Sequence, residues 1–234
     1  MSSSLTLPPT PHPTTTLWPP RRKGFLHEMV TLASAGEPDV LCLQELPAWS
    51  LPLLHTWSGM HSEGAVVRPP LWPAPFAAWL TRLNQGFFRS GLAGQANAIL
   101  VREDHSCEDL GKERISTPGV ERRVCQAVRV AGRLVVANLH ATNDFRRPEI
   151  PTAEVERARA FAEALARPGE PVVLAGDFNV LSPRLPGYSE AGPGIDHVLV
   201  RGAPATSVSV WPADQRTVAG VLLSDHAPVE ARVG

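Results

Sequence analysis

The chain has 234 residues, of which 43% are apolar and 19% are charged, a mixture typical of one large folded domain that excludes a disordered or fibrous protein. Its 22 basic and 23 acidic side chains leave a net charge of −1, so no overall charge draws it to nucleic acid or to an anionic membrane. The sequence contains neither an apolar run long enough to span a membrane nor a secretory signal, so we expect a cytoplasmic monomer with no membrane span.

The first twenty residues differ in composition from the rest of the chain. Six of the 24 prolines lie there, and each proline lacks a backbone donor and restricts the residue before it. We therefore predict an irregular Pro-rich arm at residues 1–20, followed by a single folded domain at residues 21–234.

The domain is predicted to mix strands with crossing helices. Hydrophobic periodicity separates the two kinds of element, because apolar positions recur every three to four residues in a helix and form short runs in a buried strand. The predicted elements are a helix at 21–35, a strand at 39–44 ending at Glu45, a helix at 72–84, a strand at 96–101, a hairpin of 122–130 and 133–139, a helix at 152–167 that Thr152 could cap, and strands at 171–175, 196–201, 205–210 and 226–232. This order indicates a layered α/β or α+β domain.

Polar side chains follow four of the apolar strands, at the point where each strand ends. A carboxylate in that position is more often a turn or cap residue than a ligand, so each segment is weak evidence alone. In combination they indicate a shared site, since strand ends on one edge of a sheet lie close together. The four segments are Leu43-Gln44-Glu45, Asn138-Leu139-His140, Gly176-Asp177-Phe178-Asn179 and Ser224-Asp225-His226.

This order of motifs, with Gly194-Ile195-Asp196-His197-Val198 before the last one, resembles the endonuclease/exonuclease/phosphatase superfamily, the DNase I-like metal-dependent phosphoesterases. The resemblance extends over about residues 25–234. It rests on LQE ending at Glu45, ANAIL around Asn97, NLHATND around His140, GDFN at Asp177 and Asn179, GIDHVLV at Asp196, and SDHAPV at Asp225 and His226. It implies an α+β fold, a four-layer αββα sandwich with two packed mixed sheets between helices, whose motifs meet at one end of the sheets.

A divalent cation fits this pattern on physical grounds as well. Two carboxylates at ~4 Å repel by about 4 kcal/mol at an effective dielectric constant near 20, and a cation removes that repulsion. Magnesium prefers oxygen ligands and needs only one or two carboxylates. The resemblance implies Mg²⁺, with Mn²⁺ as a common substitute, held by Glu45, with Asp225 completing or orienting that shell.

The resemblance also assigns the catalytic and substrate-binding roles. Asp177 and Asn179 should position and activate the attacking water. His226, oriented by Asp196, would act as a general base or a phosphate ligand, because an imidazole exchanges protons near neutral pH. His140 should contact the scissile phosphate or assist the leaving group. Asn97 would brace the site, or would simply be a satisfied amide at a strand end.

Three further polar residues have competing interpretations. His197 alternates with Asp196 along its strand and must face the opposite side, so we interpret it as a packing residue. Arg122 and Arg123 could present a guanidinium group to phosphate, or could be solvated or paired with Glu121.

One family feature is missing from the sequence. Family members normally begin with a strand ending in an asparagine, whereas the nearest segment here, Leu5-Thr6-Leu7, is followed by Pro8, which offers no side-chain amide. The prediction is a phosphoesterase that cleaves a phosphodiester by direct attack of water, with nucleic acid as the first choice of substrate. The alternatives are a phosphomonoesterase, a phospholipid or inositol-phosphate hydrolase, or a non-catalytic binding protein that lost the asparagine.

Overall fold

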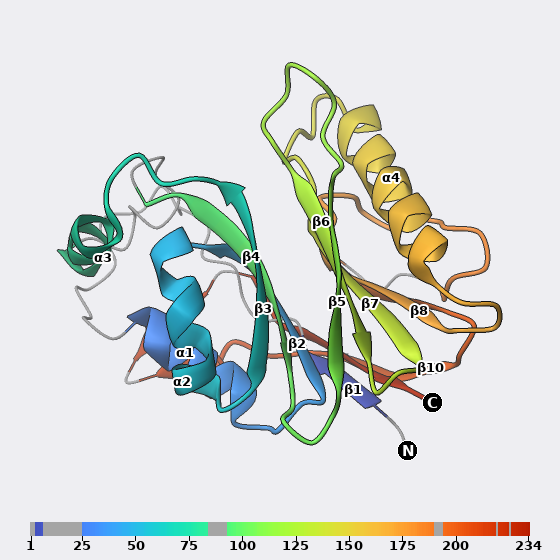
Figure 1. Ribbon diagram of the computed structural model, residues 1–234, viewed down its shortest axis with the longest axis horizontal. Coiled ribbons are helices and arrows are strands. Elements are labelled where there is room, and N and C mark those ends of the chain that lie inside the picture. Colours follow the sequence, from blue (N-terminus) through green and yellow to red (C-terminus); the bar gives the residue numbers. More distant parts are fainter. Residues whose placement is uncertain (1–2, 7–24, 84–92, 190–193, 219, 225) are drawn as a thin grey trace.

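The computed structural model describes residues 3–6, 25–83, 93–189, 194–218, 220–224 and 226–234. Within these ranges two β-sheets pack face to face, and helices cover the outer face of each sheet (Figure 1). The layers therefore run helix, sheet, sheet, helix, which is the predicted α+β sandwich.

The first sheet has six strands in the order β10-β13-β1-β2-β4-β3. Their bounds are β1 Ser3–Thr6, β2 Val40–Leu46, β3 His61–Arg68, β4 Gln95–Val101, β10 Ala205–Val210 and β13 Val229–Val233. The second sheet has five strands in the order β5-β6-β7-β8-β9. Its strands are β5 Cys107–Arg114, β6 Val124–Val130, β7 Leu134–His140, β8 Val172–Asp177 and β9 Asp196–Arg201, and a separate hairpin joins β11 Thr217–Val218 to β12 Val221–Leu222.

Strand β1 departs from the expectation of an irregular arm. Ser3–Thr6 pairs in parallel with β2 and antiparallel with β13, so it takes an interior position in the six-stranded sheet. It can do so because it ends before the first proline, Pro8, and its backbone donors are therefore intact. Residues 7–20 of the predicted arm lie outside the described residues.

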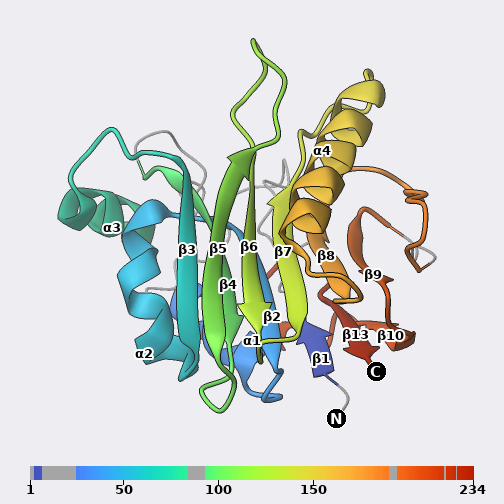
Figure 2. The same ribbon diagram turned by 45° about the vertical axis from the view of Figure 1, so that its right-hand side comes forward.

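The helices are α1 Phe25–Ser34, α2 Leu54–Ser58, α3 Ala74–Leu83 and α4 Glu149–Leu165, with a 3₁₀ helix at Ala48–Leu53. Helix α1 packs on the six-stranded sheet, whereas α4 lies along β7 and β8 of the other sheet (Figure 2). Helix α4 begins at Glu149, so Thr152 lies inside its first turn, where its hydroxyl donates to the carbonyl of Pro148 at 2.7 Å, and is not the cap. No helix in these described ranges is both long and apolar enough to cross a membrane.

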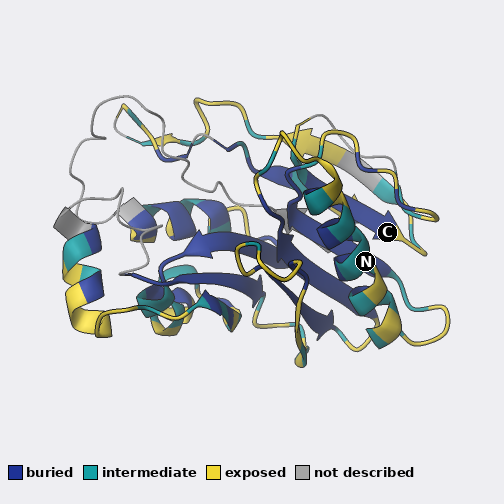
Figure 3. Cartoon of the chain, turned by 90° about the horizontal axis from the view of Figure 1, so that it is seen from above, coloured by how far each residue is buried: buried dark blue, intermediate teal, exposed yellow. Residues whose placement is uncertain are grey.

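The main core lies between the two sheets, and the central strands β2, β4, β6, β7 and β8 are buried on both faces (Figure 3). In β2, Val40 and Cys42 point into the space between the sheets, while Leu41 and Leu43 point toward α1. This alternation explains why the sequence of β2 is a continuous apolar run rather than an alternating one. A polar residue at the end of such a buried strand therefore lies between the two sheets, at their edge.

Candidate active site

Three predicted site residues are cross-strand neighbours in the five-stranded sheet. His140 ends β7 and is the register partner of Asp177 at the end of parallel strand β8. Asp177 is in turn opposite Asp196, the first residue of antiparallel strand β9. Because directly paired residues have their Cβ atoms about 4.5–5.5 Å apart, the sheet itself brings these three side chains into one row.

The glycine of GDFN is required by the close approach of β7 to β8. Gly176 has a φ of 137°, and a Cβ atom placed on it would lie 1.9 Å from the carbonyl oxygen of Leu139. No other residue fits both the backbone conformation and the space. Gly176 therefore lets the two strands remain paired up to the point where Asp177 enters the site.

Glu45 reaches the site from the other sheet by means of a β-bulge. Leu43 pairs with Ala98 and Leu46 pairs with Ala96, so two residues of β2 face the single residue Asn97. Glu45 lies in this bulge with a φ of 56°, a left-handed conformation that is unfavourable for a residue with a Cβ atom. The bulge turns the Glu45 carboxylate toward His140, and bulges beside active sites commonly redirect a side chain in this way.

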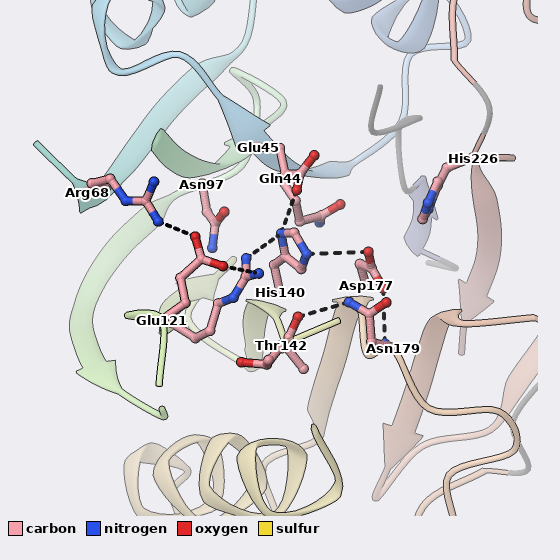
Figure 4. A network of polar contacts seen from close by, with 12 residues as sticks. Gln44, Glu45, Arg68, Asn97, Glu121, His140, Thr142, Asp177, Asn179 and His226 are labelled. Carbon is pink, nitrogen blue, oxygen red and sulfur yellow. Dashed lines mark hydrogen bonds and ion pairs between the residues drawn. The ribbon is translucent and has the colours of Figure 1, made fainter. Parts of the chain in front are cut away.

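His140 lies at the centre of the polar network (Figure 4). Its Nδ1 is 3.6 Å from Glu45 Oε1, and its Nε2 is 3.5 Å from Asp177 Oδ2. The guanidinium of Arg123 lies on the same side as Glu45, with Nη1 3.3 Å from His140 Nδ1. His140 Nδ1 therefore faces both Arg123, which can only donate, and Glu45, which as a carboxylate can only accept.

His226 forms a hydrogen-bonded pair with Asp196. Its Nδ1 is 2.7 Å from Asp196 Oδ2, and both side chains are largely buried. Because a carboxylate accepts, Nδ1 carries the proton and the lone pair is on Nε2. The backbone carbonyl of His226 accepts from Arg216 Nη1 at 3.1 Å, and this guanidinium also binds the carbonyl of Ser224, which holds the loop in place.

Asp177 is a buried carboxylate with a strongly raised pKa. It is fully buried, its Oδ1 accepts the backbone N–H of Asn179 at 3.0 Å, and its Oδ2 accepts no hydrogen bond from the described residues. Burial raises the pKa of Asp177 to about 7, and the charges of Asp196 and Glu45 act in the same direction, while His226 and the Asn179 N–H oppose them. The charged form of Asp177 is therefore disfavoured in this setting, and a nearby cation would favour it.

These observations fit a divalent cation. Asp177, Asp196 and His226 place ligand atoms within 4.8 Å of one another, so this group could hold a metal ion. On the other side of His140, Glu45 offers a further carboxylate. Carboxylate oxygens gathered in this way are the ligands that Mg²⁺ and Mn²⁺ prefer.

The structure places each remaining predicted residue as follows. Asn179 lies beside Asp177, and its Nδ2 donates to the carbonyl of Ala141 at 2.9 Å. Asn97 is buried and its Nδ2 donates to the carbonyl of Val124 at 3.3 Å, so it links the two sheets at the edge of the site. Asp225, the second predicted metal ligand, lies outside the described residues. His197 faces away from Asp196, with its Nε2 2.9 Å from the carbonyl of Val180.

Sequence reasoning left the role of Arg123 open. Arg122 is exposed, whereas Arg123 is only 5% exposed and contacts His140. Its Nη2 donates to Glu121 at 2.9 Å, and Glu121 is also paired with Arg68 at the end of β3. Arg123 is therefore paired with Glu121 and also lies in the candidate site, beside His140.

Asn138 belongs to one of the four polar segments, but the sequence assigned it no role of its own, although it shares a face of β7 with His140. Its Nδ2 donates to the carbonyls of Leu43 and Ala98 at 2.9 Å each, and its Oδ1 accepts Gln44 Nε2 at 2.8 Å. Asn138 thus joins the two sheets beside the bulge that carries Glu45. The period-two alternation of β7 was the signal that could have found it.

This four-layer sandwich, with carboxylates, imidazoles and a carboxamide gathered at one end of two facing sheets, is the fold of the DNase I-like phosphoester hydrolases. The chain belongs to the Endonuclease/Exonuclease/phosphatase family, which it matches over residues 13–226. Members of this family hydrolyse phosphoester bonds and generally depend on a divalent metal. Comparison with curated proteins gives no match.

Solved structures show the same fold at low sequence identity. A humanized D. rerio TDP2 with 14 mutations has a TM-score of 0.67 and 13% identity, covering 100% of this chain and 99% of that chain. D. rerio TDP2 complexed with a single strand DNA product has a TM-score of 0.66 and 15% identity, with coverage of 100% and 99%. The Bacteroides thetaiotaomicron mannosyl-6-phosphatase Bt3783 has a TM-score of 0.64 and 16% identity, with coverage of 99% of each chain.

Proposed function

We propose that the chain is a magnesium-dependent phosphodiesterase, with Mn²⁺ as a substitute, that cleaves nucleic acid by direct attack of water on phosphorus. The observation that carries the proposal is the row formed by His140, Asp177 and Asp196, with His226 hydrogen-bonded to Asp196. This arrangement would supply a base, a water-positioning carboxylate and a phosphate contact in one place.

Glu45 and Asp225 would hold the metal ion. Glu45 is suited to this role because the bulge directs its carboxylate into the acidic site. The role of Asp225 stays a prediction from the SDH motif. A bound divalent cation would supply Lewis-acid stabilisation of the charge that develops on the phosphoryl and leaving oxygens.

The protein groups would divide the proton transfers between them. His226, with its Nδ1 proton held by Asp196, would accept a proton from the attacking water at Nε2. Asp177 and Asn179 would orient that water. His140 would contact the scissile phosphate, or would donate a proton to the leaving oxygen as the bond from phosphorus breaks.

A nucleic-acid diester is the first choice of substrate because a structural relative is complexed with a single strand DNA product. Arg123 and Arg68 would supply local positive charge, since the net charge of −1 gives no general attraction. A phosphomonoester is the second candidate, favoured by the similarity to a mannosyl-6-phosphatase. Under both proposals the same side chains act on phosphorus.

The experiment measures hydrolysis of bis(p-nitrophenyl) phosphate, p-nitrophenyl phosphate, supercoiled plasmid and a single-stranded oligonucleotide during Mg²⁺ and Mn²⁺ titrations. Diester and oligonucleotide cleavage without monoester cleavage is the expected result. Turnover of the monoester alone would replace the proposal with a phosphatase. If the folded protein hydrolyses none of these substrates at any metal concentration, the non-catalytic alternative is favoured. The absence of asparagine from β1 also allows that alternative.

The chain offers a matched control for the catalytic pair. His105 Nε2 lies 2.9 Å from Asp39 Oδ1, and this second His–Asp pair lies at the opposite end of β2 from Glu45. We expect His226→Ala to lower the rate at least about 10²-fold, as loss of a general base typically does, while His105→Ala leaves it within about threefold. Equal effects of the two substitutions would contradict the site assignment.

A further inference from the structure

A buried carboxylate on α4 lies outside the groups assigned to the reaction. Glu154 has no solvent-exposed surface, although the other buried side chains of this helix are Pro151, Val155, Ala158 and Ala162. A charged side chain on such an apolar stripe needs partners, because burying an uncompensated carboxylate costs several kcal/mol. Its partners therefore indicate what it does.

Both oxygens of Glu154 bind one residue of the loop that follows His140. The backbone N–H of Thr142 donates to Oε2 at 2.6 Å, and the Thr142 hydroxyl donates to Oε1 at 2.9 Å. Burial raises the pKa of Glu154, while these two hydrogen bonds and the charges of Arg123 and Arg157 oppose the rise. Glu154 thus fixes the backbone at Thr142 at two points.

Ala141, the residue before Thr142, holds the carboxamide of Asn179. The N–H of Ala141 donates to the carbonyl of Asp177 at 2.8 Å, and the carbonyl of Ala141 accepts Asn179 Nδ2 at 2.9 Å. Figure 4 shows Asn179 between Thr142 and Asp177. Because a carbonyl can only accept, the amide NH₂ must face Ala141 and Oδ1 must face away from it. That Oδ1 is buried and accepts no hydrogen bond within the described ranges.

We propose that Glu154 is a positioning residue for Asn179. By clamping Thr142, it sets the carbonyl of Ala141, which holds the Asn179 amide with Oδ1 presented to the reacting water. The inference rests on the proposed function, in which Asn179 orients that water. Without Glu154 the Thr142 N–H and hydroxyl lose their acceptors, and the loop and the amide lose their fixed geometry.

A double-mutant cycle tests the proposal with bis(p-nitrophenyl) phosphate as the probe. We expect Glu154→Ala to lower kcat about tenfold to a hundredfold with KM within about twofold, as small displacements of a positioned group do. In an Asn179→Ala background the same change should lower kcat by less than about twofold, because the group it positions is gone. Glu163→Ala is the matched control on the same helix, since Glu163 pairs with Arg159 and Arg201 at the surface.

The conservative variant separates the clamp from the charge. In Glu154→Gln, Oε1 can accept the Thr142 N–H and Nε2 can donate to the Thr142 hydroxyl oxygen, so kcat should stay within about threefold of wild type. A Gln variant as impaired as the Ala variant would overturn the positioning role. If Glu154→Ala does not fold, Glu154→Gln and Thr142→Val test the positioning role instead. Thr142→Val removes only the hydroxyl contact and should lower kcat a few fold.

The outcomes distinguish the inference from the proposed function. Full activity of Asn179→Ala would remove the proposed function itself. An impaired Asn179→Ala enzyme that Glu154→Ala impairs by a further tenfold would overturn the inference alone. Hydrogen exchange in metal-free protein completes the test. The ¹H–¹⁵N signals of the Asn179 carboxamide are assigned by their loss in Asn179→Ala. Its amide protons should exchange with solvent more than tenfold faster in Glu154→Ala than in wild type, and unchanged exchange would contradict the positioning role.

Discussion

Replacing Asp177 with Asn should stabilise the metal-free protein at alkaline pH while abolishing its activity. The native pKa of Asp177 is raised to about 7 from its ordinary value of 3.8, mainly by burial. Between these two pH values the folded protein binds more protons than the unfolded chain, so this group makes stability fall as pH rises. Asparagine does not ionise, so the variant should lack that contribution.

The size of the effect follows from the pKa difference. At 1.36 kcal/mol per pKa unit the full change is about 4 kcal/mol, of which about 2.5 kcal/mol falls between pH 5 and pH 8. Urea unfolding of wild type and Asp177→Asn in EDTA, at pH values from 5 to 8, measures it. The free energy of unfolding of the variant relative to wild type should rise by about 2.5 kcal/mol across this range, and added Mg²⁺ should reverse the alkaline loss in wild type.

Asp39→Asn is the control for replacing a buried aspartate. Asp39 Oδ1 lies 2.8 Å from Arg102 Nη1, so its charge is compensated by an ion pair at the other end of β2. At pH 8 that variant should be less stable than wild type, because Arg102 and His105 lose their carboxylate partner, whereas Asp177→Asn should be more stable. Parallel pH dependence of wild type and Asp177→Asn would refute the reasoning, because it would show that Asp177 is ionised without penalty.

Three further substitutions test how the site is built. Gly176→Ala should lower the free energy of unfolding by more than about 3 kcal/mol in urea titrations, because the added Cβ would meet the carbonyl oxygen of Leu139 at 1.9 Å; normal stability would contradict the close approach of β7 to β8. Asn138→Ala should cost about 3 kcal/mol in the same assay by leaving buried carbonyls of β2 and β4 without donors, and a loss below 1 kcal/mol would show that water replaces them. Arg123→Gln should lower kcat at least about tenfold through its contact with His140, and an unchanged rate would remove Arg123 from the site.

The buried strands and their polar ends were predictable because the signal is local. In β2, β4, β7 and β8 the apolar runs are contiguous, and the residue that enters the site follows directly in the sequence. The edge strands β3 and β5 were missed for the opposite reason. Their side chains are mostly exposed or half-buried, so neither shows an apolar run, and only pairing with β4 and β6 defines them. Strand β1 was not predicted because it has only four residues and the prolines that follow it indicate irregular structure.

Contacts between distant segments account for what the sequence could not show in the site. The bulge at Glu45 is a mismatch between β2 and β4, and no single strand carries a signal for it. Arg123 could be placed only once β6 was beside β7. Glu154 did leave a local trace, a carboxylate between the inward-facing positions Pro151 and Val155, but its partner Thr142 is fixed by the packing of α4 on the sheet.

The energetic cost of the site argues against a non-catalytic role. Glu45 and Asn179 adopt left-handed backbone conformations, with φ of 56° and 50°, and such a residue costs of order 1 kcal/mol or more. The buried charge of Asp177 adds about 4 kcal/mol when it is ionised. Together these terms are a substantial fraction of the 5–15 kcal/mol that typically stabilises a domain. Strained residues and perturbed buried carboxylates cluster at catalytic sites, where they preorganise the reacting groups, so this cost favours the proposed hydrolase over the non-catalytic alternative.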